Sequence, residues 1–194
     1  MVFSEVLLGL VFIFNLRRLP IKIADGELDL VLVRPINSQF AVSLWQPYFA
    51  LVPSLVSGVI VVVYAFRAGG LSFNWWAMAP FLVVFISDLV MAYAASMMVT
   101  TLAFWWVNAS PLADLAQEVM QMSGRPYQIF SGWWRYIFLW LVPLAFMVTF
   151  PAQILLGQVQ GWWVPAAVGL AGIFLYTSHK FWNLGLKHYS SASS

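Results

Sequence analysis

Charged side chains are rare in this chain, and their rarity excludes an ordinary water-soluble domain. Only 8% of the 194 residues are charged and 62% are hydrophobic, whereas soluble domains carry about 25% charged residues. The net charge of +2 is small, and the basic residues are scattered, so the composition does not favour binding to nucleic acid. It is typical of a protein that lies in a membrane.

Groups that carry out catalysis or bind metals are also scarce. The sequence has no cysteine, which excludes disulfides and thiolate sites, and both histidines, His179 and His188, lie near the C-terminus. It contains no G-x-x-x-x-G-K-S/T phosphate loop, the motif that would cradle the phosphates of ATP. Neither a Ser–His–Asp set nor a carboxylate pair can be placed on one face. We therefore predict that the chain is not an enzyme and uses no cofactor or metal.

Long apolar runs take the place of these groups. A membrane-spanning helix needs about 20 predominantly apolar residues, and the chain has room for several. We predict an all-α, polytopic membrane protein with about five spans, forming a single domain over residues 1–194. The approximate ranges of the spans are 1–16 (a partial span), 41–66, 78–106, 136–157 and 164–184.

Pairs of tryptophans support these limits. Trp-Trp pairs begin at residues 75, 105, 133 and 162, and tryptophan favours the headgroup level of a bilayer. A helix from Trp76 to Trp105 would rise about 43 Å at 1.5 Å per residue. This rise matches the ~40–45 Å of a bilayer with its interfaces, so the pairs bracket the predicted spans.

The basic residues predict the orientation of the spans. One side of this layout carries Arg17, Arg18, Lys22, Arg34, Arg125, Arg135, Lys180 and Lys187, and the other carries Arg67. The positive-inside rule then places residues 17–40, the 108–134 loop and the C-terminus in the cytoplasm. Met1 falls outside, although an even number of spans with both ends inside is more natural. This parity predicts that a preceding span is missing.

The stretch Arg17–Pro35, RRLPIKIADGELDLVLVRP, concentrates charge between two apolar runs. Within it, Asp25 is predicted to cap a helix over Gly26–Val33, because aspartate is a preferred N-cap residue. Glu27 and Asp29 would lie in the first turn, near the positive end of the helix dipole. The stretch therefore predicts a short helix on a polar connection.

The far end of this predicted helix carries Arg34 and Pro35, a C-terminal cation and a helix breaker. The eight residues from Gly26 make a rod of about 12 Å, which is too short to span a bilayer. Leu28 belongs to the same rod. Anionic lipid would repel the acidic residues of the stretch, so a protein partner is the favoured contact of this helix.

A second short helix is predicted in the loop after the third span. Ser110 and Pro111 mark its start and Gly124 follows its end, as caps and first-turn residues do. Leu112 and Leu115 belong to an apolar series at helical spacing. The helix lies on the lipid headgroups or docks a cytoplasmic partner, and both interpretations stay open.

Three residues within spans are candidates for a transport path. Asp88 is a carboxylate near mid-membrane, where a charge costs roughly 2.5–3.5 kcal/mol and is expected to face the bundle interior. It lines a substrate path, or it is a structural residue bonded to a neighbouring Ser, Thr or Tyr. Pro143 and Pro151 favour kinks in the fourth span, which either shape a path or are ordinary features of a membrane helix.

Three segments resemble the permease subunits of bacterial ABC exporters of the second type, in particular a subgroup labelled uncharacterised ABC transport permease. The first is IADGELDLVLVRPIN at 23–37, similar to a "G-x-L-D…L-x-R-P" segment. The second is GRPYQIFSGWWRYIFLWLVPLAFMVTFPAQILLG at 124–157, and the third is FWNLGLKHYSSAS at 181–193. They occur in the family's order and reach across most of the chain.

The resemblance implies a six-span permease of the bacterial inner membrane, with both ends in the cytoplasm. It implies a homo- or heterodimer of permease subunits and a separate ABC ATP-binding subunit that contacts a coupling helix. That role carries over to the residues that match the motif, namely Gly26, Leu28, Asp29, Arg34 and Pro35; Asp25 and Glu27 join them from the capping argument. The chain departs from the family by lacking the first span, which agrees with the parity of the predicted spans.

Two other functions remain open on the sequence. A secondary transporter or channel that works without ATP would carry several charged or polar groups in mid-span, whereas this chain has essentially Asp88. A membrane scaffold subunit would have no transport path. The predicted function is an ATP-coupled exporter permease for a small organic or amphiphilic substrate.

Overall fold

The computed structural model describes residues 14–44, 52–68, 75–105, 132–133, 154 and 162–189. Within these ranges the chain forms helices and no strand, as predicted. The helices are α2 (Phe14–Ala24), α3 (Asp29–Leu32), α4 (Ser38–Ser43), α5 (Val52–Ala68), α6 (Trp75–Thr101), the 3-10 helix η3 (Leu102–Phe104) and α10 (Trp163–His188).

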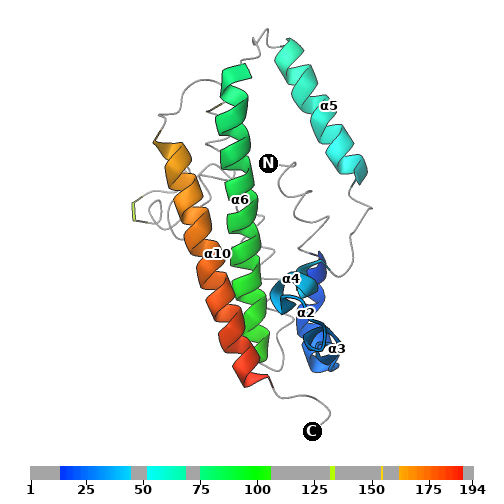
Figure 1. Cartoon of the computed structure of the whole chain (residues 1–194). Coiled ribbons are helices and arrows are strands. Elements are labelled where there is room, and N and C mark those ends of the chain that lie inside the picture. Colours follow the sequence, from blue (N-terminus) through cyan, green and yellow to red (C-terminus); the bar gives the residue numbers. More distant parts are fainter. Residues whose placement is uncertain are drawn as a thin grey trace.

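Helix α6 is the central helix among those described (Figure 1). Its segment Met78–Phe104, which runs on into η3, is the one described helix long and apolar enough to cross a membrane, and it falls within the predicted span 78–106. Hydroxyl groups of α6 donate back to carbonyls of the same helix, as from Ser96 to Ala92 at 2.9 Å. Such bonds satisfy polar side chains without a partner from outside the helix.

Helix α10 packs along α6 and runs in the same direction (Figure 1). Val84 and Met91, in the middle of α6, form a buried apolar cluster with Ala167 and Ala171 from the first turns of α10 and with Ile154. Small side chains such as alanine allow two helices in a membrane to approach closely. Close apolar packing therefore holds the first turns of α10 against the middle of α6.

The end of α10 differs from the sequence prediction. The sequence predicts a span over 164–184, but the helix runs from Trp163 to His188. The reason is tertiary packing, because residues that precede and follow Asn183 in the sequence are buried against the neighbouring helices. Trp182 and Gly185 are buried, and Leu186 packs against the same apolar cluster as Trp182.

Helices α2, α3 and α4 lie together beside the C-terminal ends of α6 and α10 (Figure 1). Residues 17–24 were predicted as part of a polar connection, but they belong to α2, and Pro20 lies inside that helix. The buried side chains of Leu16 and Leu19 explain this difference, since they bury one face of α2 against α6 and α10.

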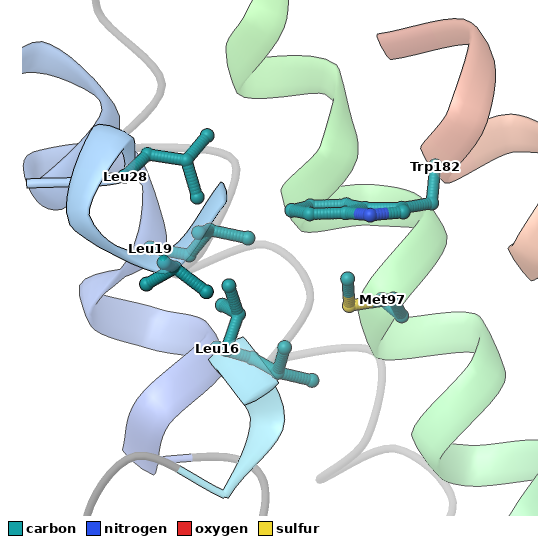
Figure 2. Close-up of a cluster of buried hydrophobic side chains, with 7 residues drawn as sticks. Leu16, Leu19, Leu28, Met97 and Trp182 are labelled. Atoms are coloured by element: carbon teal, nitrogen blue, oxygen red, sulfur yellow. The ribbon is translucent and has the colours of Figure 1, made fainter. Parts of the chain in front are cut away.

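Figure 2 shows the cluster that joins these elements. Its buried members, called the anchor cluster below, come from α2, the α2–α3 connection, α3, α4, α6 and α10. They are Leu16, Leu19, Leu28, Val31, Val42, Met97 and Trp182.

Helix α5 stands away from the other described helices (Figure 1). Most of its described side chains are exposed apolar groups, including Val59, Ile60 and Val63. Arg67 lies in its last turn, at the end that faces the start of α6. Most of the predicted spans 1–16 and 136–157 falls outside the described residues.

Candidate functional site

The turn between α2 and α3 is built on Gly26. Its φ of +74° lies in the left-handed region that glycine adopts without a steric cost. The amide of Asp25 donates to the carbonyl of Ile21 at 2.9 Å, and the amide of Gly26 donates to that of Ile23 at 3.3 Å. Gly26 therefore ends α2, in the way glycine commonly ends helices.

This turn corrects the predicted helix over Gly26–Val33. Helix α3 begins only at Asp29, its N-cap residue is Leu28, and no side chain caps it. Asp25 is thus not an N-cap, and Glu27 lies in the turn before the helix. The prediction failed because Gly26 was placed inside a helix, whereas its positive φ breaks the helical path.

Leu28 fixes the short helix α3 to the rest of the protein. Its side chain is fully buried in the anchor cluster, where the Trp182 indole extends from α10 toward the α2–α3 side (Figure 2). Val31, three residues later, is buried in the same cluster. Residues three apart share one face of a helix, so α3 attaches to the bundle through a single apolar face.

The opposite side of this segment exposes large apolar side chains. Val33 is 85% exposed, and Leu30, Ile36 and Phe40 are also exposed. We call these four residues the projecting face. Clustered apolar exposure of this kind marks an interaction site more often than a solvated surface.

The C-terminal features of the predicted helix lie beside the projecting face. Helix α3 ends at Leu32, and Arg34 and Pro35, both exposed, follow it. A proline one to three residues after a helix is a common stop signal. Arg34 therefore lies beyond the last turn of α3, in the connection to α4.

Charges tie the α2–α3 turn to its surroundings. Lys22 and Glu27 form an ion pair at 3.8 Å. Partial burial lowers the pKa of Lys22, and Glu27 opposes this change. At the end of α10, burial raises the pKa of Tyr189, and the neighbouring Asp29 carboxylate raises it further. Asp29 of α3 therefore acts electrostatically on Tyr189, the residue that follows α10.

Helix α4 carries a polar network that the sequence analysis did not predict. Its N-cap is Asn37, whose side-chain oxygen accepts from the amide of Phe40 at 3.3 Å. Gln39 donates through Nε2 to the Ser178 hydroxyl at 3.2 Å. Its Oε1 lies 2.9 Å from Nδ1 of His179. One amide therefore holds two successive residues of α10.

Ser43, the last residue of α4, holds α6 and α2. The Ser43 hydroxyl donates to the Gln39 carbonyl at 2.7 Å, so its 2.8 Å contact with the Tyr93 hydroxyl is donated by Tyr93. The carbonyl of Ser43 accepts from Asn15 Nδ2 at 3.0 Å. The sequence carried one signal of this network, namely the amide residues Asn15 and Gln39 close to apolar runs. A buried polar side chain needs a hydrogen-bond partner, so such residues indicate a polar contact between helices.

Asp88 lies away from this network, in the middle of α6. It is 1% exposed, and neither carboxylate oxygen has a hydrogen-bond partner among the described residues. Its neighbours on the same helix face are Val84 and Met91, which pack against the alanines of α10. The predicted bond from a neighbouring Ser, Thr or Tyr is therefore not seen in the described part of the chain.

Leu112, Leu115, Pro143 and Pro151 lie outside the described residues. Among the residues that are described, no group of His, Cys, Asp and Glu could hold a metal ion.

Comparison with known proteins identifies one family. Residues 1–193 match the family described as ABC-2 family transporter protein. No curated protein and no solved structure matches the chain.

Proposed function

Because this chain belongs to the ABC-2 transporter family, we propose that it is the membrane permease subunit of an ATP-driven exporter. It pairs with a second permease subunit and forms the path for a small organic or amphiphilic substrate. A separate ATP-binding subunit hydrolyses ATP and moves the permease through the α2–α4 segment, whose residues 25–29, 34 and 35 are the proposed coupling residues.

The observation that carries the proposal is the two-sided construction of this segment. Leu28 and Val31 are buried in the anchor cluster, whereas Val33 and Ile36 are exposed. A segment that packs against the bundle through one face and exposes apolar groups on the other can transmit a displacement from a bound partner to the helices. These exposed apolar side chains favour a protein as that partner.

The location of this segment agrees with a cytoplasmic partner. Lys22 of α2 and Lys187 of α10 are at the same end of the bundle, whereas Arg67 lies at the opposite end. A basic excess on one side favours the cytoplasm for that side. We therefore propose that α3 and the C-terminus face the cytoplasm of a bacterial cell, where ATP is available.

Charges on the projecting face are expected to release the ATP-binding subunit. We predict that the double variant Val33→Asp, Ile36→Asp still inserts in the membrane, since both side chains are exposed. An unpaired charge buried at an interface costs on the order of 2–5 kcal/mol, so co-purification of the ATP-binding subunit falls more than about tenfold. The measurement is quantitative pull-down from solubilised membranes.

Ile21→Asp is the matched control, because Ile21 is a similarly exposed isoleucine on α2 and lies outside the projecting face. It is expected to leave co-purification close to that of the unaltered chain. The proposed coupling role is wrong if the double variant retains the ATP-binding subunit at the normal level.

Asp88 is the proposed polar group of the transport path. A buried carboxylate that receives no hydrogen bond from the described residues is available to a positively charged compound once the helices around it separate. We expect Asp88→Asn to lower ATP-driven uptake of the cationic dye ethidium into inside-out vesicles, because the amide keeps the size but removes the charge. Ser87→Ala is the control, since Ser87 is buried next to it and donates to its own helix at Val83. Unchanged ethidium uptake by Asp88→Asn would remove Asp88 from the path.

A further inference from the structure

We infer that α4, with Gln39 at its centre, is the link that carries movement of the projecting segment to α6 and α10. This inference rests on the proposed function, because it concerns how the push of the ATP-binding subunit reaches the spans. Gln39 is a positioning residue here, since it acts through the helices that it holds and contacts no substrate.

The first step is the rigid attachment of α4 to α3. Four residues, 33–36, separate the end of α3 from the cap of α4. The amide of Ile36 donates to the carbonyl of Arg34 at 2.8 Å, and the amide of Arg34 donates to that of Val31 at 3.1 Å. The connection is therefore folded on itself, and α4 must follow a displacement of α3.

The second step is that α4 is hydrogen-bonded to several helices at once. Gln39 bonds Ser178 and His179 of α10, and Ser43 bonds Tyr93 of α6. The same turn receives the bond from Asn15 of α2. The six-residue helix α4 therefore holds three helices that are far apart in the sequence.

A further bond lies at the start of α4. Trp182 of α10 donates its indole N–H to the Ser38 hydroxyl at 3.0 Å. The His179 ring is contacted at both nitrogens. Its Nδ1 faces Gln39, and its Nε2 lies 3.1 Å from Nδ2 of Asn183. These two contacts fix the orientation of the His179 ring, and with it the direction of its hydrogen bond to Gln39.

The third step is that the hydrogen bonds of α4 transmit movement more rigidly than the apolar contacts of the anchor cluster do. Apolar contacts such as that of Leu28 with Trp182 are non-directional, so side chains can slide across one another while the area stays buried. A hydrogen bond weakens steeply when its angle departs from linearity, and a broken one leaves a buried polar group unpaired. The polar network of α4 therefore allows little slippage between the segment and α10.

The test uses the absence of cysteine from this chain, because each introduced cysteine is then a unique labelling site. One nitroxide label is placed at Val33→Cys on the projecting face, and another, in a separate sample, at Leu175→Cys on the exposed side of α10. Each labelled permease is studied as its complex with the ATP-binding subunit in lipid nanodiscs. The measurement is the change of the electron paramagnetic resonance spectrum on addition of ATP.

Without further substitution, we expect both labels to respond to ATP. With Gln39→Leu, the label at position 33 still responds and the response at position 175 is lost. Gln39→Glu should restore it, because a carboxylate accepts from both Ser178 and His179. Thr177→Val is the matched control on α10, since the Thr177 hydroxyl is exposed and donates to carbonyls of its own helix, at Ile173 and Phe174.

The outcomes separate the inference from the proposed function. A full response at position 175 in Gln39→Leu overturns the inference and assigns transmission to the anchor cluster. No response at position 33 in the otherwise unaltered chain overturns the proposed function, and the inference with it. If Gln39→Leu does not assemble, the pair Ser178→Ala and His179→Leu removes the same two bonds from the α10 side, and the same loss at position 175 is required.

Discussion

Replacement of Trp182 by alanine is expected to cost about 3–5 kcal/mol of stability, the range for truncating a large buried aromatic side chain. The Trp182 side chain is fully buried and meets the Phe104 ring edge to face at a centroid distance of 5.2 Å. Its removal empties the centre of the anchor cluster and leaves Ser38 without its donor. The measurement is reversible unfolding of the purified chain in mixed micelles.

Trp76→Ala provides the comparison, because Trp76 is 90% exposed. Truncation of an exposed side chain changes stability by about 0.5 kcal/mol or less. Similar losses in the two variants would contradict the central position of Trp182. A loss confined to Trp182→Ala would show that Trp182 contributes much of the packing between the α2–α4 segment and α10.

Gly185→Val is expected to push η3 away from α10. A Cβ at position 185 would overlap the ring of Phe104 and would stand 2.9 Å from the side chain of Thr101. Overpacking of a close contact typically costs 1–3 kcal/mol, and the Phe104 ring has little room because it also packs on Trp182 and Tyr189. We therefore predict a lower midpoint of unfolding and a weaker attachment of the segment to α10.

Gly172→Val is the matched control for this substitution. It makes the same chemical change in the same helix, but a Cβ at position 172 meets nothing within 4 Å. Helix propensity changes equally in both variants, so the difference between their unfolding midpoints isolates the contact with Phe104 and Thr101. Equal midpoints would mean that α10 does not approach η3 as closely as the structure shows.

Both variants test the same property of the bundle. Trp182 and Gly185 lie one turn apart on α10, and both face Phe104. This contact joins the end of α6 to the end of α10, directly beside the buried Leu28. A push on α3 therefore acts on a closely packed junction rather than on a single isolated helix.

The sequence by itself determined the class of the protein and the limits of its central helix. The scarcity of charge and the long apolar runs demand a membrane, and the tryptophan pairs place α6 between residues 75 and 105. These features depend on composition and spacing along one chain. Three motifs also indicated the family, which the match over residues 1–193 confirms.

The tertiary structure decided where the short helices begin and end. Local preferences favoured a helix capped by Asp25, but the positive φ of Gly26 ends α2 and moves the start of α3 to Asp29. The same holds for α10, whose last turn is polar in sequence and buried on one side in the fold. Burial against a neighbouring helix outweighs the weak propensities of single residues.

The polar network also depended on the fold. Gln39 is 139 positions from Ser178 and 140 from His179 along the chain, and no periodic pattern relates residues so far apart. Only the packing of α4 against α10 brings their donors and acceptors within hydrogen-bond distance. The sequence determined that the chain must lie in a membrane, because apolar surface has to leave water. The structure alone showed which polar groups meet, because hydrogen bonds require proximity in space.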